Sequence, residues 1–591
     1  MSKQKQSDET LSFDGVTAER VKIGILVDGP TIKGWEMSII EQLLSDEGFE
    51  LVAVIENCCK KLGFINRLRR RWYRIPWWII NRIEAQLSLL LFGGHWKTFD
   101  YAVDEHVPLE RINKRFEHIR VLPQVSRSLL IHRFTKEDLE RVRALNLDVL
   151  LYFGFNFLRG EILKVARFGV WSYHHADNAV NRGGPPGFWE VYKGQHYTGA
   201  TLQMLTEDLG NGVVIRKGMY STFLYSWNEN RRRLYWKSRF LMTDALNELK
   251  ETKSIPERRD HSSSEFELYC HPLFVAPLLP AVFFACVKLA WRITGKILTK
   301  LVLRKQWQPL LCRGALKGRS MRQFESVIGP NGRYWADPFL VQRDGVNWMF
   351  FEDFNFHQKK GCISCVRLKS EGYDRYQEVM KLPYHLSYPF LFEHQETLYM
   401  IPETHKNRTI ELWKNRRFPD QWEKLHAIFD NVSAVDTTLL EHNGRWWMFV
   451  NIDRSGLGDF GSELFVYYTD DPVQGGWQPH SANPVLVDVR RARMGGGFTR
   501  TRRGRPIRCG QIGGPVYGAG LKFFEVVKLT TSTYEEKLVE EINPAWRPDA
   551  VGIHHCHRQS DLTAFDVCVR VPRFRWALPG NLASKRRTPP I

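Results

Sequence analysis

Residues 169–215 read GVWSYHHADNAVNRGGPPGFWEVYKGQHYTGATLQMLTEDLGNGVVI, and this stretch decides how the N-terminal half of the chain folds. Gly169 to Tyr173 is predicted to be a short strand that ends at two adjacent imidazoles, His174 and His175. The segment that follows is too rich in Gly and Pro to form helix or sheet. We therefore expect a strand that delivers two histidines into a shaped loop.

The second half of this stretch predicts two further strands joined by a turn. Residues 198–205, TGATLQML, read as a strand, and residues 208–212, DLGNG, read as a tight turn. The turn leads into Val213-Val-Ile, the start of the third strand. Polar and glycine residues recur at fixed places along these elements, namely Ser172, His174, Arg182, Gly183, Trp189, Thr198, Gly199, Thr201, Gly210 and Gly212.

This spacing resembles the catalytic half of the 10-formyltetrahydrofolate-dependent formyltransferases, which include the methionyl-tRNA and sugar N-formyltransferases. Their signature is Asn-x-His-Pro-Ser, Arg-Gly-x-x-Pro-x-x-Trp, Thr-Gly-x-Thr and Asp-x-Gly. The resemblance implies an open α/β sheet, 10-formyltetrahydrofolate as cofactor and an amino sugar as acceptor. It also implies a set of substrate-binding residues in the loop and second strand: Arg182, Gly183, Trp189 and Thr198.

Two polar catalytic positions of that family are changed in this chain. The family's Asn is Ser172 and its Asp is Gly210, so His174 alone is kept. Formyl transfer to an amine needs donors for a tetrahedral oxyanion and a base for the amine proton. His174 and Ser172 are candidate donors, and the candidate replacements for the missing carboxylate are His175, Asp177 and Asp208. The alternative is a domain that keeps the fold but has lost or changed the reaction.

The composition favours anionic partners. The chain has 591 residues, enough for two or three domains, and its 84 basic and 65 acidic residues give a formal net charge of +19. Nucleotide-linked sugars and phospholipid head groups would suit this charge. Because the sequence lacks an RNA-binding signature, no specific nucleic-acid partner is expected.

Ten cysteines are scattered along the chain without an even pattern. Together with an N-terminus that does not read as a secretory segment, this predicts reduced thiols and a cytoplasmic protein. The CxxC motif Cys362–Cys365 lies in a predicted strand, where residues three apart point to opposite faces. Packing is therefore expected there instead of metal or redox chemistry.

The chain divides into a disordered start, an α/β domain, a linker with an apolar segment, an all-β domain and a tail. The predicted boundaries are 1–19, 20–250, 251–306, 307–575 and 576–591. The α/β domain opens with a strand from Val21, a helix from Trp35 to Leu44 and a strand at 51–55, followed later by helices at 135–145, 160–167 and 228–250.

Two segments combine basic and apolar residues. Residues 62–96 place arginines beside tryptophans and a short apolar run, and residues 273–305 place an apolar run before lysines and arginines. Both predict amphipathic elements on an anionic membrane surface, which would make the protein peripheral on the inner face of the cell membrane. The alternative for each is an ordinary helix packed inside the protein.

The C-terminal half contains a repeat. The segments that begin at Trp335, Ser387 and Val435 align by eye, and two fainter copies lie near 497–511 and 551–566. Asp337, Tyr388 and Asp436 are equivalent and lie 51 and 48 residues apart. A period near 50 with hairpin units predicts propeller blades, and five copies predict a five-bladed propeller.

The repeats resemble five-bladed propellers of arabinanase and levansucrase type. Through the ADPF and YPF…PE starts they resemble more closely the N-terminal region of plant glucosamine inositolphosphorylceramide transferases. Both resemblances imply sugar binding, with Asp337, Glu403 and Asp436 as candidate carboxylates in an axial pocket. The alternative is that these residues cap turns. His554-His-Cys-His557 is not expected to bind metal, because alternate strand faces would separate its imidazoles.

Three functions follow. The first is a formyltransferase-like enzyme that transfers a formyl or related acyl group to an amino sugar in glycan or glycolipid biosynthesis, with an amino-sugar nucleotide or glycolipid as substrate. The second is a catalytically degenerate glycan-binding scaffold of polysaccharide assembly. The third is a glycosidase or glycosyltransferase that uses the propeller carboxylates.

Overall fold

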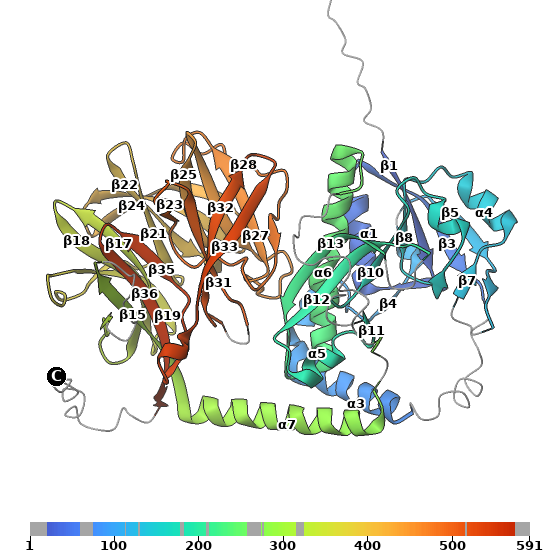
Figure 1. The fold of residues 1–591 in the computed structure, drawn as a ribbon, viewed down its shortest axis with the longest axis horizontal. Coiled ribbons are helices and arrows are strands. Elements are labelled where there is room, and N and C mark those ends of the chain that lie inside the picture. The colour runs from blue at the N-terminus through green and yellow to red at the C-terminus, as the bar shows by residue number, and fades with distance from the viewer. Residues whose placement is uncertain are drawn as a thin grey trace, which may run out of the picture.

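The computed structural model has a mixed α/β N-terminal part and a largely β C-terminal part, as the sequence predicts (Figure 1). The structure describes residues 20–59, 75–112, 114–127, 131–177, 182–207, 212–256, 273–274, 277–314, 324–514 and 517–573. The predicted disordered start and the tail from residue 576 lie outside the described residues, as does the turn at 208–211.

A seven-stranded sheet in the order β13-β12-β10-β8-β1-β3-β5 forms the centre of the N-terminal part. Its five strands from β10 to β5 pair in parallel, whereas β12 and β13 are antiparallel. The parallel strands are rich in buried Val, Ile and Leu because both faces of the sheet are covered. The strands are β1 Val21–Val27, β3 Phe49–Asn57, β5 Glu117–Val121, β8 Val149–Tyr152, β10 Val170–His174, β12 Tyr197–Met204 and β13 Val213–Ser221.

Short strands form three separate small sheets in this part, β2 with β4, β6 with β7 and β9, and β11 with β14. These short strands are β2 Thr31–Lys33, β4 His106–Pro108, β6 Gln124–Val125, β7 Ile131–Arg133, β9 Phe157–Leu158, β11 Arg182–Gly183 and β14 Leu273–Phe274. Four helices accompany the sheet, α1 Gly34–Leu44, α4 Lys136–Arg143, α5 Phe188–Lys193 and α6 Trp227–Thr252. The helix expected at 160–167 is a single 3-10 turn, Glu161–Lys164, because the backbone reverses at Gly160 (φ 87°) and Gly169 (φ 76°).

The C-terminal part consists of five antiparallel sheets, counted over the described residues. The first sheet joins β15 Leu303–Arg313 and β16 Glu325–Ser326 with β34 Ala550–Gly552, β35 Cys556–Gln559 and β36 Leu562–Pro572. β15 pairs with β36 along its whole length, from Leu303 opposite Pro572 to Arg313 opposite Leu562. The two ends of this part of the chain therefore lie in one sheet.

Each of the other four sheets uses consecutive strands of the chain, and the repeats found in the sequence supply their first two strands. They are β17 Arg333–Arg343, β18 Val346–Asn355, β19 Lys360–Arg367 and β20 Gln377–Met380; β21 Ser387–His394, β22 Thr397–Thr404, β23 Thr409–Arg417 and β24 Gln421–Asp430; β25 Ala434–His442, β26 Arg445–Ile452, β27 Glu463–Thr469, β28 Gln478–Pro479 and β29 Leu486–Val487; β30 Thr499–Arg500, β31 Pro506–Gln511, β32 Leu521–Leu529 and β33 Tyr534–Ile542. Cys362 and Cys365 pack inside β19, as expected.

Polar contacts and a long helix connect the two parts. The Arg454 guanidinium bonds both carboxylate oxygens of Asp244 on α6 at 2.8 and 2.9 Å and also binds Glu463 at 2.6 Å. The Trp236 indole N–H donates to the Ser455 carbonyl at 2.9 Å. α7, Leu279–Val302, runs along one side of both parts, next to α3, Ile75–Phe92 (Figure 1). Within the described residues, neither helix is long and apolar enough to cross a bilayer.

Candidate functional site

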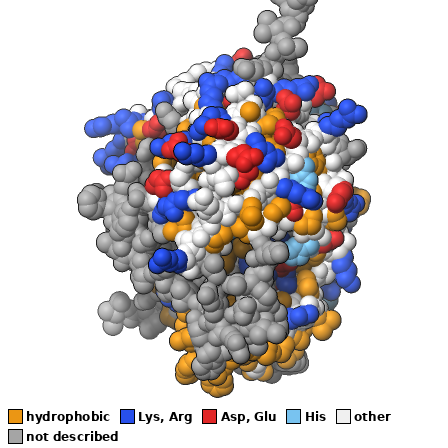
Figure 2. Space-filling view, turned by 90° about the vertical axis from the view of Figure 1, so that its right-hand side faces the viewer, with side chains coloured by type: hydrophobic (Ala, Val, Ile, Leu, Met, Phe, Trp, Pro, Cys, Tyr) orange, Lys and Arg blue, Asp and Glu red, His pale blue; other side chains and the backbone are white. Residues whose placement is uncertain are grey.

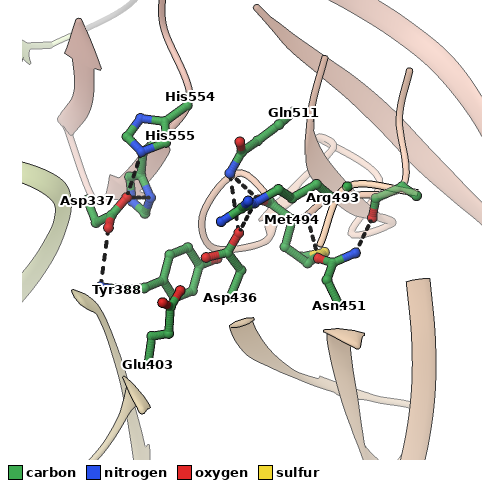
Figure 3. Close-up of polar contacts among 12 residues, drawn as sticks. Asp337, Tyr388, Glu403, Asp436, Asn451, Arg493, Met494, Gln511, His554 and His555 are labelled. Carbon is green, nitrogen blue, oxygen red and sulfur yellow. Dashed lines mark hydrogen bonds and ion pairs between the residues drawn. The ribbon is translucent and has the colours of Figure 1, made fainter. Parts of the chain in front are cut away.

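The first strands of three successive sheets carry the same strained position. Asp337, Tyr388 and Asp436 have φ angles of 51°, 44° and 55°. Residues other than glycine rarely adopt positive φ angles of this kind. In each case the register with the second strand shifts at this residue. The shift turns all three side chains toward one another (Figure 3). Strain repeated at equivalent positions marks this place as a candidate site.

The second strands add two carboxylates. Glu352 lies opposite Ala336, Glu403 opposite Ser387 and Asn451 opposite Val435, so these three residues are equivalent in the repeat. Asn451 has a structural role: its side-chain amide donates to the carbonyls of Glu463 and Ala492 and accepts from the backbone N–H of Met494. Glu352 and Glu403 are thus the two acidic members of the set, each with a side chain 8% exposed.

The pKa values of Glu403 and Glu352 are shifted in opposite directions. Burial would raise the pKa of Glu403, but the imidazole of His405, 2.6 Å from its Oε1, lowers it below the usual value. Burial raises the pKa of Glu352 well above the usual value, and the charges of Asp337 and Glu403 add to this effect. Glu352 is therefore the weaker acid of the pair and Glu403 the stronger.

A histidine lies between two aspartates beside this pair. His554 Nδ1 is 2.8 Å from Asp566 Oδ1, and its Nε2 is 3.3 Å from Asp337 Oδ1. Burial lowers the pKa of His554, but the charge and hydrogen bond of Asp566 outweigh it and raise the pKa. Burial raises the pKa of Asp337 to about 7. The three side chains form a proton-holding chain of the type carboxylate–imidazole–carboxylate.

These three residues are also the group of described side chains that could hold a metal ion, with ligand atoms within 4.8 Å of one another. The expected separation of the histidines by strand alternation is wrong, because residues 553–555 lie before β35 and outside any strand. His554 and His555 both lie beside Asp337, as Figure 3 shows. His555 is buried, and burial lowers its pKa well below the usual value.

A guanidinium and aromatic rings complete the site. Arg493 Nε is 2.7 Å from Asp436 Oδ2, and Gln511 donates to the same oxygen at 3.3 Å (Figure 3). Burial raises the pKa of Asp436 to about 6 although Arg493 opposes this shift. The guanidinium lies 4.7 Å above the Tyr517 ring, which is 46% exposed. An exposed ring face, that of Tyr517, next to a carboxylate and a cation suits a sugar, which presents C–H faces and hydroxyl groups.

A hollow in another place lacks this chemistry. It has a volume of about 520 Å³ and is lined by the turns at 441–444 and 500–505. Its Arg500 donates to the carbonyls of Glu441 and Gly504, and its Arg505 pairs with Glu525. Volume alone would favour this hollow. We assign the site instead to the carboxylate cluster, by which we mean Asp337, Glu352, Glu403, Asp436 and Asp566 with His554 and Arg493, because the buried, interacting ionisable groups of this cluster have shifted pKa values.

The structure divides the candidate residues of the N-terminal part. Ser172 and His174 lie on β10, and His174 pairs with Thr201 of β12. His175 is enclosed by Trp35, Tyr173 and Tyr235, with ring centroids 4.0 to 5.1 Å away. Burial lowers its pKa well below the usual value, so it is a neutral residue packed among these rings, and its Nε2 has no hydrogen-bond partner among the described atoms.

The predicted substrate-binding residues of that part mostly make internal contacts. Thr198 is buried and hydrogen-bonds Thr222 and Asn230 at 2.8 and 3.2 Å. The Trp189 indole donates to the Gly184 carbonyl at 3.3 Å. Gly183 lies in β11 together with the main chain of Arg182, while the Arg182 side chain and all of Asp208 lie outside the described residues. Asp177 forms an ion pair with Lys217 at 2.6 Å.

Sequence reasoning missed Glu352, Arg493, His405 and Asp566. Glu352 could have been found, because it aligns with Glu403 when the second strands of the repeat are superimposed. Arg493 and His405 lie outside the aligned segments, and Asp566 is the last residue of the faint copy at 551–566; only the folded chain brings these three residues to the site.

Comparison with known proteins gives a partial match. Residues 324–547 match the family model described as glucosamine inositolphosphorylceramide transferase 1, N-terminal. The transferase of that name from Oryza sativa subsp. japonica is 29% identical over 212 residues, which cover 35% of this chain and 28% of the relative. The Arabidopsis thaliana protein is 28% identical, with 35% and 27% covered. The matched part therefore spans less than a third of these relatives.

Two kinds of solved structure are similar to parts of the chain. One is glycinamide ribonucleotide transformylase 1 from Symbiobacterium toebii, with 15% identity, a TM-score of 0.27, and 40% of this chain and 92% of that chain covered. The other is the catalytic domain of a GH62 α-L-arabinofuranosidase from Coprinopsis cinerea, with 11% identity, a TM-score of 0.33, and 41% and 94% covered.

Proposed function

We propose that the chain is an enzyme of glycolipid biosynthesis that binds a sugar head group at the carboxylate cluster and transfers a glycosyl unit there. The observation that carries this proposal is the pair of repeat-equivalent carboxyl groups, Glu352 and Glu403, with opposite pKa shifts. Support comes from the match over residues 324–547, which includes both glutamates, Asp337, Asp436 and Arg493. The relatives are named as transferases of glucosamine inositolphosphorylceramide.

The opposite pKa shifts assign the steps. Glu352, a carboxylic acid, donates its proton to the glycosidic oxygen as the bond to the anomeric carbon breaks. Glu403, a carboxylate, accepts the proton of the acceptor hydroxyl as that oxygen forms the new bond. His405 keeps Glu403 ionised. Asp337 and His554 exchange the proton between them and, with Arg493, would bind the hydroxyl or phosphate groups of the head group.

We further propose that the five sheets are the blades of a propeller whose axis passes through this cluster. The pairing of β15 with β36 would close the ring, and the first strands of neighbouring sheets contact each other, β15 with β17, β17 with β21 and β21 with β25. The strained residues at the starts of β17, β21 and β25 would then face the axis. This arrangement would bring Asp337, Tyr388 and Asp436, which come from three different sheets, close together, as Figure 3 shows.

Turnover of glycosides by the full chain tests the catalytic proposal. Release of nitrophenol from a panel of 4-nitrophenyl glycosides, including the α-L-arabinofuranoside and the β-D-glucosaminide, is expected to fall at least a hundredfold in Glu352→Gln and Glu403→Gln. Glu393→Gln is the control, because Glu393 lies on β21 of the same sheet as Glu403 and is 53% exposed. Binding of glucosamine or inositol 1-phosphate without any turnover would instead favour the glycan-binding scaffold.

Formyl or acyl transfer by the N-terminal part is a second candidate, favoured by His174 at the carboxyl end of a central strand. The residues present do not fit 10-formyltetrahydrofolate chemistry. Gly210 replaces the family's carboxylate, His175 is a half-buried imidazole packed among aromatic rings with a lowered pKa, and Asp177 is paired with Lys217. We therefore derive no step through this cofactor. Calorimetry with 5-formyltetrahydrofolate tests donor binding, and saturable binding that His174→Ala weakens would restore this candidate.

A further inference from the structure

Most of the strongly exposed apolar side chains of the described residues lie on α3 and α7. Leu90 is 81% exposed on α3, and Trp291 is 80% exposed on α7. We define the α3–α7 face by the side chains of these helices that are at least 49% exposed: Ile79, Ile83, Leu87, Leu90, Leu91, Leu279, Phe283, Phe284, Val287, Trp291, Ile297, Leu298, Leu301 and Val302. Both helices lie along the same lower side of the molecule in Figure 1, and Figure 2 shows hydrophobic side chains gathered at that edge.

α3 directs three of its polar residues, Asn81, Glu84 and Ser88, into the protein, while Arg82 and Gln86 are exposed. Asn81 accepts from the Trp227 indole at 2.9 Å and from Asn228 at 3.0 Å. Ser226 donates to Glu84 at 2.5 Å, and Arg232 donates to Ser88 at 2.8 Å. A surface helix of a protein in water normally has the reverse orientation, with its apolar side inward. These bonds to α6 fix α3 with its isoleucines and leucines facing outward.

α7 is held in a similar way by its cations. Lys288 donates to the Tyr192 carbonyl at 3.1 Å, and Arg292 donates to the Val191 carbonyl at 2.7 Å. The Lys296 ammonium lies 3.9 Å above the Tyr225 ring. These residues, four apart, run along one side of the helix, and Val282, Ala285 and Leu289 pack beside them. The wide stripe from Phe283 through Trp291 to Leu301 is left outside.

The charged side chains of α7 all have one sign. α7 carries Lys288, Arg292, Lys296 and Lys300 and no acidic residue, and Arg304 and Lys305 follow at its end. Apolar side chains of this size, with Trp and Phe among them and lysines along the flank, fit the boundary between lipid head groups and acyl chains. The cations would add attraction to anionic lipids.

We propose that the α3–α7 face docks on the surface of an anionic lipid bilayer, with its apolar side chains inserted between head groups and α7 lying parallel to the membrane plane. Docking requires no activity of the β region, so the two proposals stand or fall separately. Docking would, however, hold the carboxylate cluster close to the membrane in which a glycolipid substrate lies.

Flotation of the full chain with vesicles tests this proposal. The wild type is expected to float with vesicles of phosphatidylcholine and phosphatidylserine at 3:1, and to float at least fivefold less with phosphatidylcholine alone or in 1 M salt. The double variant Phe283→Glu/Trp291→Glu should lose at least tenfold in the floated fraction. Because both side chains are exposed, 60% and 80%, these changes should leave folding intact, which circular dichroism checks.

The matched control is Val527→Glu/Leu538→Glu, two exposed apolar residues on β32 and β33 at 52% and 48% exposure. It should float like the wild type. Equal flotation of the α7 variant, or no flotation of the wild type with anionic vesicles, would overturn the proposal. A third result would also overturn it: neither protein floats, and sedimentation shows that the wild type forms a dimer while the α7 variant does not. The α3–α7 face would then bind a second copy of the chain instead of a membrane.

Discussion

Asp566 is the residue on which the geometry of the carboxylate cluster most depends. It is fully buried, and it accepts hydrogen bonds from the backbone N–H groups of His554, His555 and Asp337 at 3.0 to 3.2 Å. It also bonds the His554 ring at 2.8 Å. In Asp566→Asn, one oxygen becomes an NH2 group of the same size. At least one buried donor then faces another donor, and the remaining bonds lose their charge.

The expected cost can be worked from these contacts. An orphaned buried donor costs about 1–3 kcal/mol, and the loss of charge from the other bonds costs about 1 kcal/mol more, so we expect about 3 kcal/mol in total. For a region of this size, each 1 kcal/mol lowers the melting temperature by about 2–4 °C, which gives a fall of about 6–12 °C.

Scanning calorimetry of the full chain measures this shift in the transition of the C-terminal part. Asp470→Asn is the control, because Asp470 is 84% exposed and its pair with Arg445 should contribute at most about 1 kcal/mol. A fall of less than about 2 °C in Asp566→Asn would refute the reasoning, since the four contacts would then not organise the site.

Two further predictions concern pH and the contact between the two parts. Burial raises the folded-state pKa of Asp337 to about 7, and Asp566 raises that of His554, so the folded state holds protons that the unfolded chain releases. The imidazoles of His555 and His557 have pKa values lowered by burial and act in the opposite sense, so the contribution of Asp337 is read as a difference. The melting temperature of the wild type minus that of Asp337→Asn should fall as the pH rises from 5 to 8, and a difference that rises over this range would show the opposite linkage. Arg454→Met leaves Asp244 and Glu463 without their shared cation, which should cost about 3–5 kcal/mol and separate the calorimetric transitions of the two parts. Arg445→Met, an exposed arginine, should leave the trace unchanged, and an identical trace for Arg454→Met would contradict the role given to this contact.

The sequence predicted elements with a strong local pattern. The strand that ends near His174, the long helix after Trp227 and the repeated strands from Trp335 onward all lie close to their predicted positions. Their apolar periodicities and turn residues are local, so they can be recognised without the rest of the chain. The helix expected at 160–167 is shorter because two glycines with positive φ reverse the backbone on either side of it.

The site was predictable only where the repeat pointed to it. Asp337 and Asp436 were found because they recur with the period, and Glu403 through the resemblance of the repeats to sugar-binding propellers; the structure brings Asp337 and Asp436 into one cluster with Tyr388. Their partners come from distant segments: Arg493 is 57 residues from Asp436, and Asp566 is 229 residues from Asp337. The pKa shifts that distinguish Glu352 from Glu403 arise from burial and neighbours, which no local pattern encodes.

The same limit applies to the orientation of α3 and α7. Their composition predicted amphipathic helices, but a helical wheel cannot say which side meets the protein. Asn81 and Glu84 would read as a solvent-facing stripe, yet they bond Trp227 at the start of α6 and Ser226, which precedes it. The decision depends on polar partners that lie more than 140 residues away in sequence.

Chemical rescue of Glu403→Gly tests most directly whether the carboxylate cluster performs glycosyl transfer. Azide attacks an anomeric carbon without having to lose a proton, so it can replace both the acceptor hydroxyl and the base that deprotonates it. With the 4-nitrophenyl glycoside that the wild type cleaves, the variant should regain turnover as azide is added and form a glycosyl azide of defined anomeric configuration, whereas Glu393→Gly should be as active without azide as the wild type. Failure of azide to restore turnover in Glu403→Gly, or activity of that variant without azide, would contradict the role of Glu403 and with it the proposed site.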